Sequence, residues 1–350
     1  MNGGSAADAT SETASRGPAE LHPAGPTGTE AGQSLVASPA ADAGSSAGRL
    51  GVTLEPVLQR ACQGRLSPVT WFRTDWQRGG AVTGYATYRD EEETDQAVVV
   101  KLPVPPRERQ WLLALQHAED VVPRLYAHGE ALNGYDLAWL VMERLPHGPL
   151  GSAWGPAGFD LLVEAAGRFY AASRHVDPHG EPYQTDWPAV AERARKAVQA
   201  GSVPNQQRWN KALKKAQRKA KAWARTWHDR ACDDWCHGDL HLANAMTRQP
   251  APEGPAVLFD FAHTRVGHWL EDAIYLEHLF WGRADRLDGR RLARQIARER
   301  KSLGLPVDDN WADLAQIKRA LLAMTAPARL AHDGDPVHLA AALAVLEASV

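Results

Sequence analysis

The pattern of apolar residues divides this chain into a strand-rich part and a longer helical part. Between residues 66 and 145, short runs of aromatic and β-branched residues alternate with turn formers, which is typical of β-strands. From residue 158 onward, apolar residues recur every three or four positions over long segments, which indicates amphipathic helices. The sequence therefore predicts an α+β fold with two lobes, a small antiparallel β lobe and a larger helical lobe.

The strand-rich part predicts a five-stranded antiparallel sheet with one helix. The helix is expected in RERQWLLALQHA, residues 107–118, between the third and the fourth strand. Gly79 and Gly80 fall between the first two strands, where backbone N–H groups of a turn can cover phosphates. The expected strands are VTWFRTDWQ (69–77), AVTGYATYR (81–89), AVVVKL (97–102), VVPRLYAHG (121–129) and YDLAWLVMERL (135–145).

The first residues have a composition that does not favour a folded core. Of residues 1–48, 35 are Ala, Gly, Ser, Thr or Pro, so this segment cannot bury enough apolar surface to offset the entropy of ordering. We therefore expect a disordered tail over 1–48, the β lobe over 49–149 and the helical lobe over 150–350.

Charge, cysteine content and hydropathy exclude several classes of protein. The formal net charge of −3 lacks the basic excess of nucleic-acid-binding proteins. A lysine-rich helix over 204–230 is interpreted as a solvated face opposite an apolar stripe, with nucleic-acid binding as the minor alternative. Apolar runs such as LAWLVM, 137–142, are much shorter than the roughly 20 residues that cross a membrane. Three cysteines and no secretory signal favour the cytoplasm.

Functional residues concentrate in the segment WCHGDLHLANAM, residues 235–246. Within it, Asp239 precedes Asn244 by five residues, which is the spacing of the protein-kinase catalytic loop. In such a loop the aspartate orients or deprotonates an acceptor hydroxyl, and the asparagine oxygen binds Mg²⁺. A second carboxylate is needed on that ion, and Asp260, at the end of the apolar run AVLF, is the candidate.

The β lobe offers a lysine and an acid for the nucleotide. Lys101 follows four apolar residues in the third strand, the position of the phosphate-binding lysine in kinases. Its expected partner is Glu108 on the following helix, and Glu119 is the alternative.

These motifs together resemble the aminoglycoside phosphotransferase and choline kinase family, small-molecule kinases with a protein-kinase-like fold. The resemblance covers roughly residues 66–290. CHGDLHLAN, VLFDF and GHWLEDAIYLE are similar to the catalytic loop, the metal loop and the following helix; VVVKL, RERQWLLAL, VVPRLYAHG and LVMERLPHG are similar to the β lobe and hinge. The chain departs from the family at Leu242, Ala243 and Ala262, none of which replaces a required ligand.

The resemblance implies a kinase reaction and assigns its parts. ATP, or alternatively GTP, would be the phosphate donor with Mg²⁺, and the acceptor would be a hydroxyl of a small molecule. Met142 and Glu143, with the backbone as far as Leu145, would receive the purine. Asp272 would hydrogen-bond the backbone of the catalytic loop without contacting substrate.

Several alternatives remain open at this point. Cys232, Cys236, His237 and His241 form a second, less favoured hypothesis, a zinc site, although their spacing matches no familiar zinc pattern. The two histidines are otherwise expected to orient the loop through hydrogen bonds. The alternative to an enzyme is a nucleotide-binding regulatory module of the same fold that has no turnover.

The acceptor is not defined by the sequence. Glu271 and Glu277 could favour a cationic acceptor, or could be surface charges of a helix.

Overall fold

The computed structural model describes the two halves of the chain and most of their connections. Residues 46–72, 81–152, 155–176, 180, 182–201, 203–330 and 335–350 are described. The predicted turn residues Gly79 and Gly80, and most of the predicted tail, lie outside these ranges.

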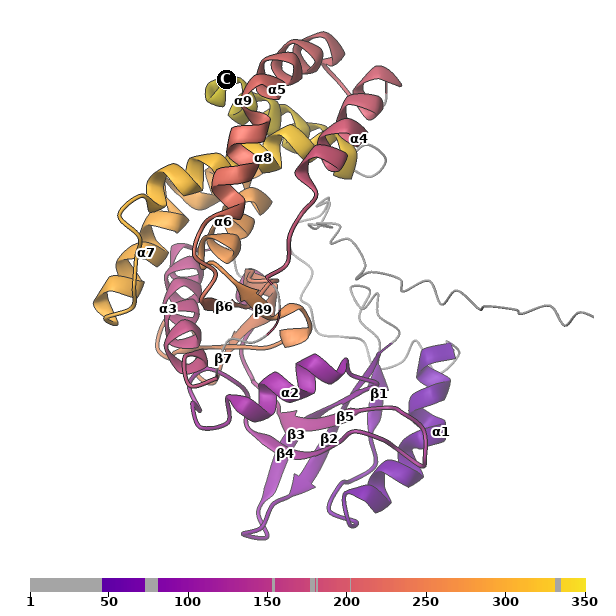
Figure 1. The fold of residues 1–350 in the computed structure, drawn as a ribbon. Helices are drawn as coiled ribbons and strands as arrows, with labels where there is room; N and C mark the ends of the chain where they lie inside the picture. The colour runs from indigo at the N-terminus through magenta and orange to yellow at the C-terminus, as the bar shows by residue number, and fades with distance from the viewer. Residues whose placement is uncertain are drawn as a thin grey trace, which may run out of the picture.

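The described part of the N-terminal half contains two helices and five strands (Figure 1). They are α1 (Ser46–Ala61), β1 (Thr70–Phe72), β2 (Val82–Arg89), β3 (Asp95–Leu102), α2 (Pro106–Ala114), β4 (Leu125–Gly129) and β5 (Trp139–Glu143). The strands form one antiparallel sheet in the order β1-β2-β3-β5-β4, which confirms the predicted sheet and its single inserted helix.

The C-terminal half is mainly helical, and its described residues also form two short β-ribbons (Figure 1). Its helices are α3 (Pro156–Ser173), α4 (Trp187–Gln199), α5 (Gln206–His228), α6 (Leu270–Leu279), α7 (Leu292–Ser302), α8 (Trp311–Leu330) and α9 (Pro336–Ser349). Its strands are β6 (Asp234–Cys236), β7 (Ala245–Thr247), β8 (Ala256–Leu258) and β9 (Arg265–Gly267). Short 3₁₀ turns are η1 (Leu150–Ser152), η2 (Leu242–Asn244), η3 (Phe261–His263) and η4 (Trp281–Leu287).

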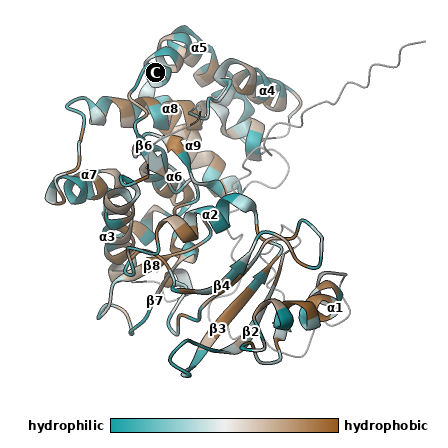
Figure 2. Cartoon of the chain, turned by 60° about the horizontal axis from the view of Figure 1, so that its bottom comes forward, coloured by the Kyte–Doolittle hydropathy of each residue, from teal (hydrophilic) through white to brown (hydrophobic). Residues whose placement is uncertain are grey.

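Strand β3 is covered on both faces, which explains its nearly continuous apolar sequence. Val98, Val100 and Leu102 are fully buried in a core cluster with residues of α1, whereas Val99 packs against the cluster that contains α2. Figure 2 shows hydrophobic residues along the central strands. Because side chains alternate along a strand, Lys101 lies on the face of Val99, toward α2.

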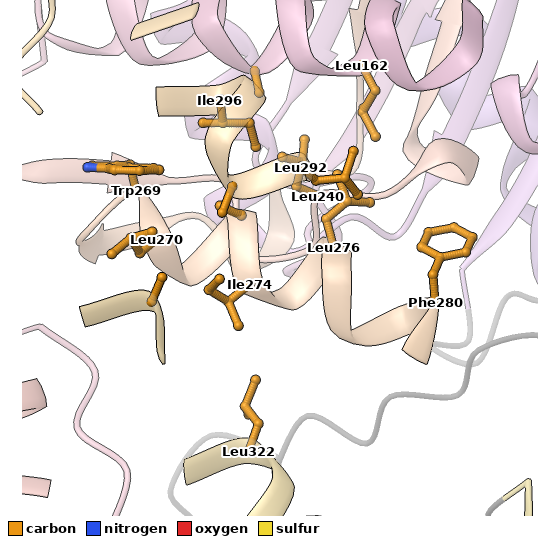
Figure 3. Close-up of a cluster of buried hydrophobic side chains, with 14 of the residues drawn as sticks. Leu162, Leu240, Trp269, Leu270, Ile274, Leu276, Phe280, Leu292, Ile296 and Leu322 are labelled. Carbon is orange, nitrogen blue, oxygen red and sulfur yellow. The ribbon is translucent and has the colours of Figure 1, made fainter. Parts of the chain in front are cut away.

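The helical half is built around α6. Apolar side chains of α6 pack against neighbouring helices and the segment that leads into the catalytic loop. Figure 3 shows Leu162, Leu240, Trp269, Leu270, Ile274, Leu276, Phe280, Leu292, Ile296 and Leu322 in this buried cluster. Helix α6 is therefore fixed from several sides.

Helix α1 is a finding that the sequence pattern did not predict, and it begins within the last residues of the expected tail. It contains Gly51 and Pro56, which both disfavour helix. Gly51 is explained by packing, because a Cβ there would lie 2.8 Å from the Trp71 ring. Glu55 fastens the helix to β1, since its carboxylate accepts hydrogen bonds from the Val69 amide and the Trp71 indole at 3.0 and 2.8 Å.

The packing of α1 on the sheet can be tested by truncating Leu58, which is fully buried. Leu58→Ala should lower the free energy of unfolding by about 2–4 kcal/mol, as expected for a leucine removed from a core. Val52→Ala is the matched control, because Val52 lies on the same helix and is 55% exposed. Chemical denaturation showing equal stability for the two variants would contradict the docking of α1.

Candidate active site

A buried carboxylate holds the backbone of the predicted catalytic loop. Asp272 on α6 accepts hydrogen bonds from the amides of His237 and Gly238, both at 2.8 Å, and from the Tyr170 hydroxyl at 3.1 Å. Burial raises the pKa of Asp272 to about 6, while the amides of Gly238 and His237 and the charge of Arg265 oppose the shift. The predicted role of Asp272, holding the loop without reaching substrate, agrees with this geometry.

Gly238 is required by the shape of the loop. Its φ is +83°, a conformation that residues with a Cβ rarely adopt. A Cβ at this position would also lie 2.1 Å from the carbonyl oxygen of His263. The close approach of these two backbone segments therefore requires glycine at position 238.

His237 orients the loop as a neutral imidazole. Its Nδ1 accepts the Asp239 amide at 3.3 Å, so the proton resides on Nε2, which donates to the Phe259 carbonyl at 3.2 Å. Burial lowers the pKa of His237 to about 4. The imidazole therefore links the catalytic loop to the residue before Asp260.

The Asp239 carboxylate is held by three side chains. Oδ1 accepts the Tyr275 hydroxyl at 2.6 Å. Oδ2 accepts the Asn244 amide at 3.1 Å and lies 3.4 Å from Nε2 of His241. Burial acts to raise the pKa of Asp239, but His241, Tyr275 and His237 outweigh it and hold that pKa well below its usual range. The carboxylate is thus charged at neutral pH.

Lys101 and Glu108 form a close ion pair between β3 and α2. Nζ of Lys101 lies 2.6 and 2.8 Å from the two carboxylate oxygens of Glu108, which is 1% exposed. Burial acts to lower the pKa of Lys101, and the carboxylates of Glu108 and Asp260 outweigh it, so the net shift is upward. The alternative acid, Glu119, is 3.7 Å from Arg124 instead.

Asp260 approaches Lys101 from the helical half. Its Oδ1 lies 3.9 Å from Nζ of Lys101, and its side chain is 38% exposed. The residue adopts a left-handed conformation, with φ +65°, directly after the β7–β8 pairing. The amide of Phe259 donates to the Asn244 carbonyl at 3.2 Å, so the hairpin brings Asn244 and Asp260 to the same end.

The donor atoms at this end fit a hard divalent cation. The amide nitrogen of Asn244 is engaged by Asp239, at its carbonyl and carboxylate, so the amide oxygen points away from that residue. Asp260 contributes a partly exposed carboxylate. Two oxygen donors of this kind suit Mg²⁺, whose remaining ligands are usually phosphate oxygens and water. Within the described ranges, no group of three or more His, Cys, Asp or Glu side chains is arranged as a metal site.

The predicted purine-binding residues differ in their environments. Met142 pairs with Val99 across the sheet and therefore shares the face of Lys101. The Glu143 carboxylate instead accepts two hydrogen bonds from Arg248, both at 2.7 Å. The side chain of Glu143 is therefore committed to the β7 region, and its backbone amide donates to the Arg124 carbonyl at 2.8 Å, so neither group is left for a ligand.

The two glutamates that could have favoured a cationic acceptor are buried in ion pairs. Glu271 lies between Arg230 and Arg265, and Glu277 accepts from Arg319 at 2.7 and 2.9 Å. Each negative charge is neutralised within the protein. Neither of the two earlier interpretations, cation recognition or a surface charge, agrees with these positions.

The residues of the zinc hypothesis are also engaged elsewhere. The thiol of Cys236 donates to the His268 carbonyl, and that of Cys232 to the Arg230 carbonyl. His241 accepts the Ala243 amide at Nδ1, which leaves Nε2 for Asp239. These contacts support the loop-orienting role expected for the histidine.

Tyr275 is the site residue that the sequence analysis missed. The available signal was its position on α6, three residues after Asp272, because residues three apart lie on one side of a helix.

None of the helices in the described ranges is both long enough and apolar enough to cross a bilayer.

The chain has a protein-kinase-like fold. Its β sheet carries a lysine paired with a glutamate, and its helical half carries the loop with Asp239. The chain belongs to the phosphotransferase enzyme family, whose model matches residues 79–312. The resemblance inferred from the motifs is thereby confirmed.

Solved structures support the fold. An aminoglycoside phosphotransferase from Alicyclobacillus acidocaldarius is 16% identical, with 81% of this chain and 88% of that chain covered and a TM-score of 0.51. For a candidate aminoglycoside phosphotransferase from Ralstonia eutropha the identity is 14%, the coverage 84% and 98%, and the TM-score 0.52. A search of curated proteins gives no match.

The neutral state of His237 predicts a pH-dependent contribution to stability. Its pKa is about 4 in the folded protein and has the ordinary value of about 6.5 in an unfolded chain. As the pH falls from 7 to 4, the unfolded chain binds a proton here first, so this residue lowers the free energy of unfolding by roughly 3 kcal/mol.

Chemical denaturation at pH 7 and pH 4 should therefore show a smaller acid-induced loss for His237→Gln than for the wild type. His117→Gln, at an exposed site, is the control and should lose as much stability as the wild type. Identical losses in all three proteins would contradict a buried, neutral His237.

Proposed function

We propose that this chain is an ATP-dependent phosphotransferase that transfers the γ-phosphoryl group to a hydroxyl of a small molecule. One observation carries the proposal: Nζ of Lys101, which is paired with Glu108, lies 3.9 Å from the Asp260 carboxylate. The residue before Asp260 is Phe259, whose carbonyl accepts a hydrogen bond from His237 in the predicted catalytic loop. A cation and a carboxylate from different halves thus converge beside Asp239 and Asn244. Such convergence suits a magnesium–triphosphate.

Lys101 would contact the α and β phosphates. Its charge is maintained by Glu108, and its position on the same sheet face as Met142 suits a nucleotide whose base lies near the hinge. The hinge backbone, at the end of β5, would receive the purine. GTP, which has the same triphosphate, is the alternative donor.

Asn244 and Asp260 would hold Mg²⁺ through oxygen atoms. When bound, the ion neutralises charge on the phosphates. The partial exposure of Asp260, 38% of its side chain, leaves its carboxylate accessible.

Asp239 would act on the acceptor. The acceptor oxygen forms a bond to the γ-phosphorus, the bond from that phosphorus to the β–γ bridging oxygen breaks, and ADP leaves with the electron pair. The acceptor proton passes to the Asp239 carboxylate. Because the pKa of Asp239 is held low, the carboxylate first orients the hydroxyl and accepts the proton as the new bond develops.

The competing function is a nucleotide-binding module without turnover. The presence of Lys101, Glu108, Asp239, Asn244 and Asp260 in connected positions favours the enzyme. A panel of hydroxylated amines, sugars and nucleosides, assayed with MgATP for phosphate transfer, separates the two. Binding of MgATP without acceptor-dependent turnover would favour the module.

Asp239→Asn should lower kcat by about 10² or more, because the amide cannot take the proton. The affinity for MgATP, measured by calorimetry, should remain nearly unchanged, since Asp239 is assigned to the acceptor. Asp136→Asn, at an exposed loop position, is the control for the substitution itself. Equal kcat values for Asp239→Asn and wild type would refute the assigned role.

Asp260→Ala should instead weaken MgATP binding, by tenfold or more, because it removes an anionic ligand of the ion. ATP binding in the presence of EDTA should change much less, which isolates the metal-dependent part. Asp309→Ala, at another exposed carboxylate, provides the control. Unchanged MgATP affinity in Asp260→Ala would remove this residue from the metal site.

A further inference from the structure

The contact between Tyr275 and Asp239 extends the site beyond the residues assigned above. The Tyr275 hydroxyl donates to Oδ1 of Asp239 at 2.6 Å. Burial and the neighbouring Asp239 charge raise the pKa of Tyr275 well above its ordinary value, so the phenol keeps its proton. Tyr275 is therefore a permanent hydrogen-bond donor to the carboxylate.

The hydrogen bonds at Asp239 leave a defined position for an incoming hydroxyl. A carboxylate has about four lone-pair positions, two on each oxygen. Asn244 and His241 approach Oδ2, and Tyr275 takes one position on Oδ1. One position on Oδ1 remains, and the Asp239 side chain is 20% exposed, so part of the residue can be reached from outside.

We propose that Tyr275 is a positioning residue that fixes the Asp239 carboxylate, and that the acceptor hydroxyl binds the remaining lone pair of Oδ1 alongside the Tyr275 phenol. The part that concerns the acceptor rests on the proposed function. The acceptor oxygen would then contact both the carboxylate and the edge of the phenol, so Tyr275 forms one wall of the acceptor subsite.

One helix provides both supports of the catalytic loop. Asp272 and Tyr275 lie three residues apart on α6, so they face the same side of the helix. Asp272 fixes the backbone of the loop and Tyr275 fixes the carboxylate that the loop carries. The direction of the Asp239 carboxylate therefore depends on the position of α6.

Tyr275→Phe tests the proposal, because it removes the donor and keeps the ring. We expect kcat to fall about tenfold with every acceptor, including water in slow MgATP hydrolysis, consistent with the loss of a hydrogen bond to a charged group. The KM for MgATP should stay unchanged, since Tyr275 acts on the acceptor side. Tyr135→Phe, at a tyrosine that is 61% exposed, is the matched control and should retain wild-type rates.

A double-mutant cycle with Asp239→Asn separates positioning from a merely structural role. If Tyr275 acts through the Asp239 carboxylate, Tyr275→Phe should have little further effect in the Asp239→Asn background. A structural role would lower the rate by the same factor in both backgrounds. An unchanged kcat in Tyr275→Phe, or full additivity in the cycle, would overturn the proposal.

The same four proteins provide a measurement that does not require turnover. The free energies of unfolding of the wild type, the two single variants and the double variant give the coupling between Tyr275 and Asp239. If the wild type transfers phosphate to no acceptor and not to water, the proposed function fails, and with it the acceptor subsite. Measurable coupling would then still support the positioning role, and zero coupling would overturn it.

Discussion

The hydrogen bonds of Asp272 are the interaction on which the rest of the site depends. Its carboxylate is 1% exposed and receives two backbone amides and a tyrosine hydroxyl. A buried carboxylate without such donors would be strongly destabilising, so the loop backbone and the carboxylate require each other. The loop in turn determines where Asp239 and Asn244 lie. The position of α6, set by apolar packing, thus determines the geometry of the polar site.

The sheet contributes to the site through the alternation of side chains along β3. Three apolar side chains of this strand are buried in the cluster with α1, while Val99 and Lys101 face α2. This alternation places a charged group at the side of the sheet where α2 provides Glu108. Because a lysine and a glutamate buried together are each costly alone, their pairing fixes α2 against β3.

Sequence patterns predicted the partners of a side chain where segments that are close in sequence interact. They did not predict partners that come from segments distant in sequence. The pairing of Lys101 with Glu108 was predictable because a helix that follows a strand packs back on it within a few residues. Glu271 pairs with Arg230, which lies just after α5, and Glu277 pairs with Arg319 on α8. Both arginines are distant in sequence, so a local pattern could not reveal these pairings. Helix α1 was missed because Gly51 and Pro56 lower its propensity, and packing against Trp71 outweighs that effect.

Exposure separates the groups that can react from the groups that hold them. The side chains of Lys101, Asp239 and Asp260 are 17, 20 and 38% exposed, whereas Glu108, His237 and Asp272 are buried residues. Glu108 hydrogen-bonds Lys101 and His237 accepts the Asp239 amide, whereas Asp272 holds the loop backbone next to Asp239 through the amides of His237 and Gly238. A site arranged in this way can admit substrate and keep its geometry. The hydrogen bonds of the buried residues orient the reactive side chains, and water cannot compete for these bonds.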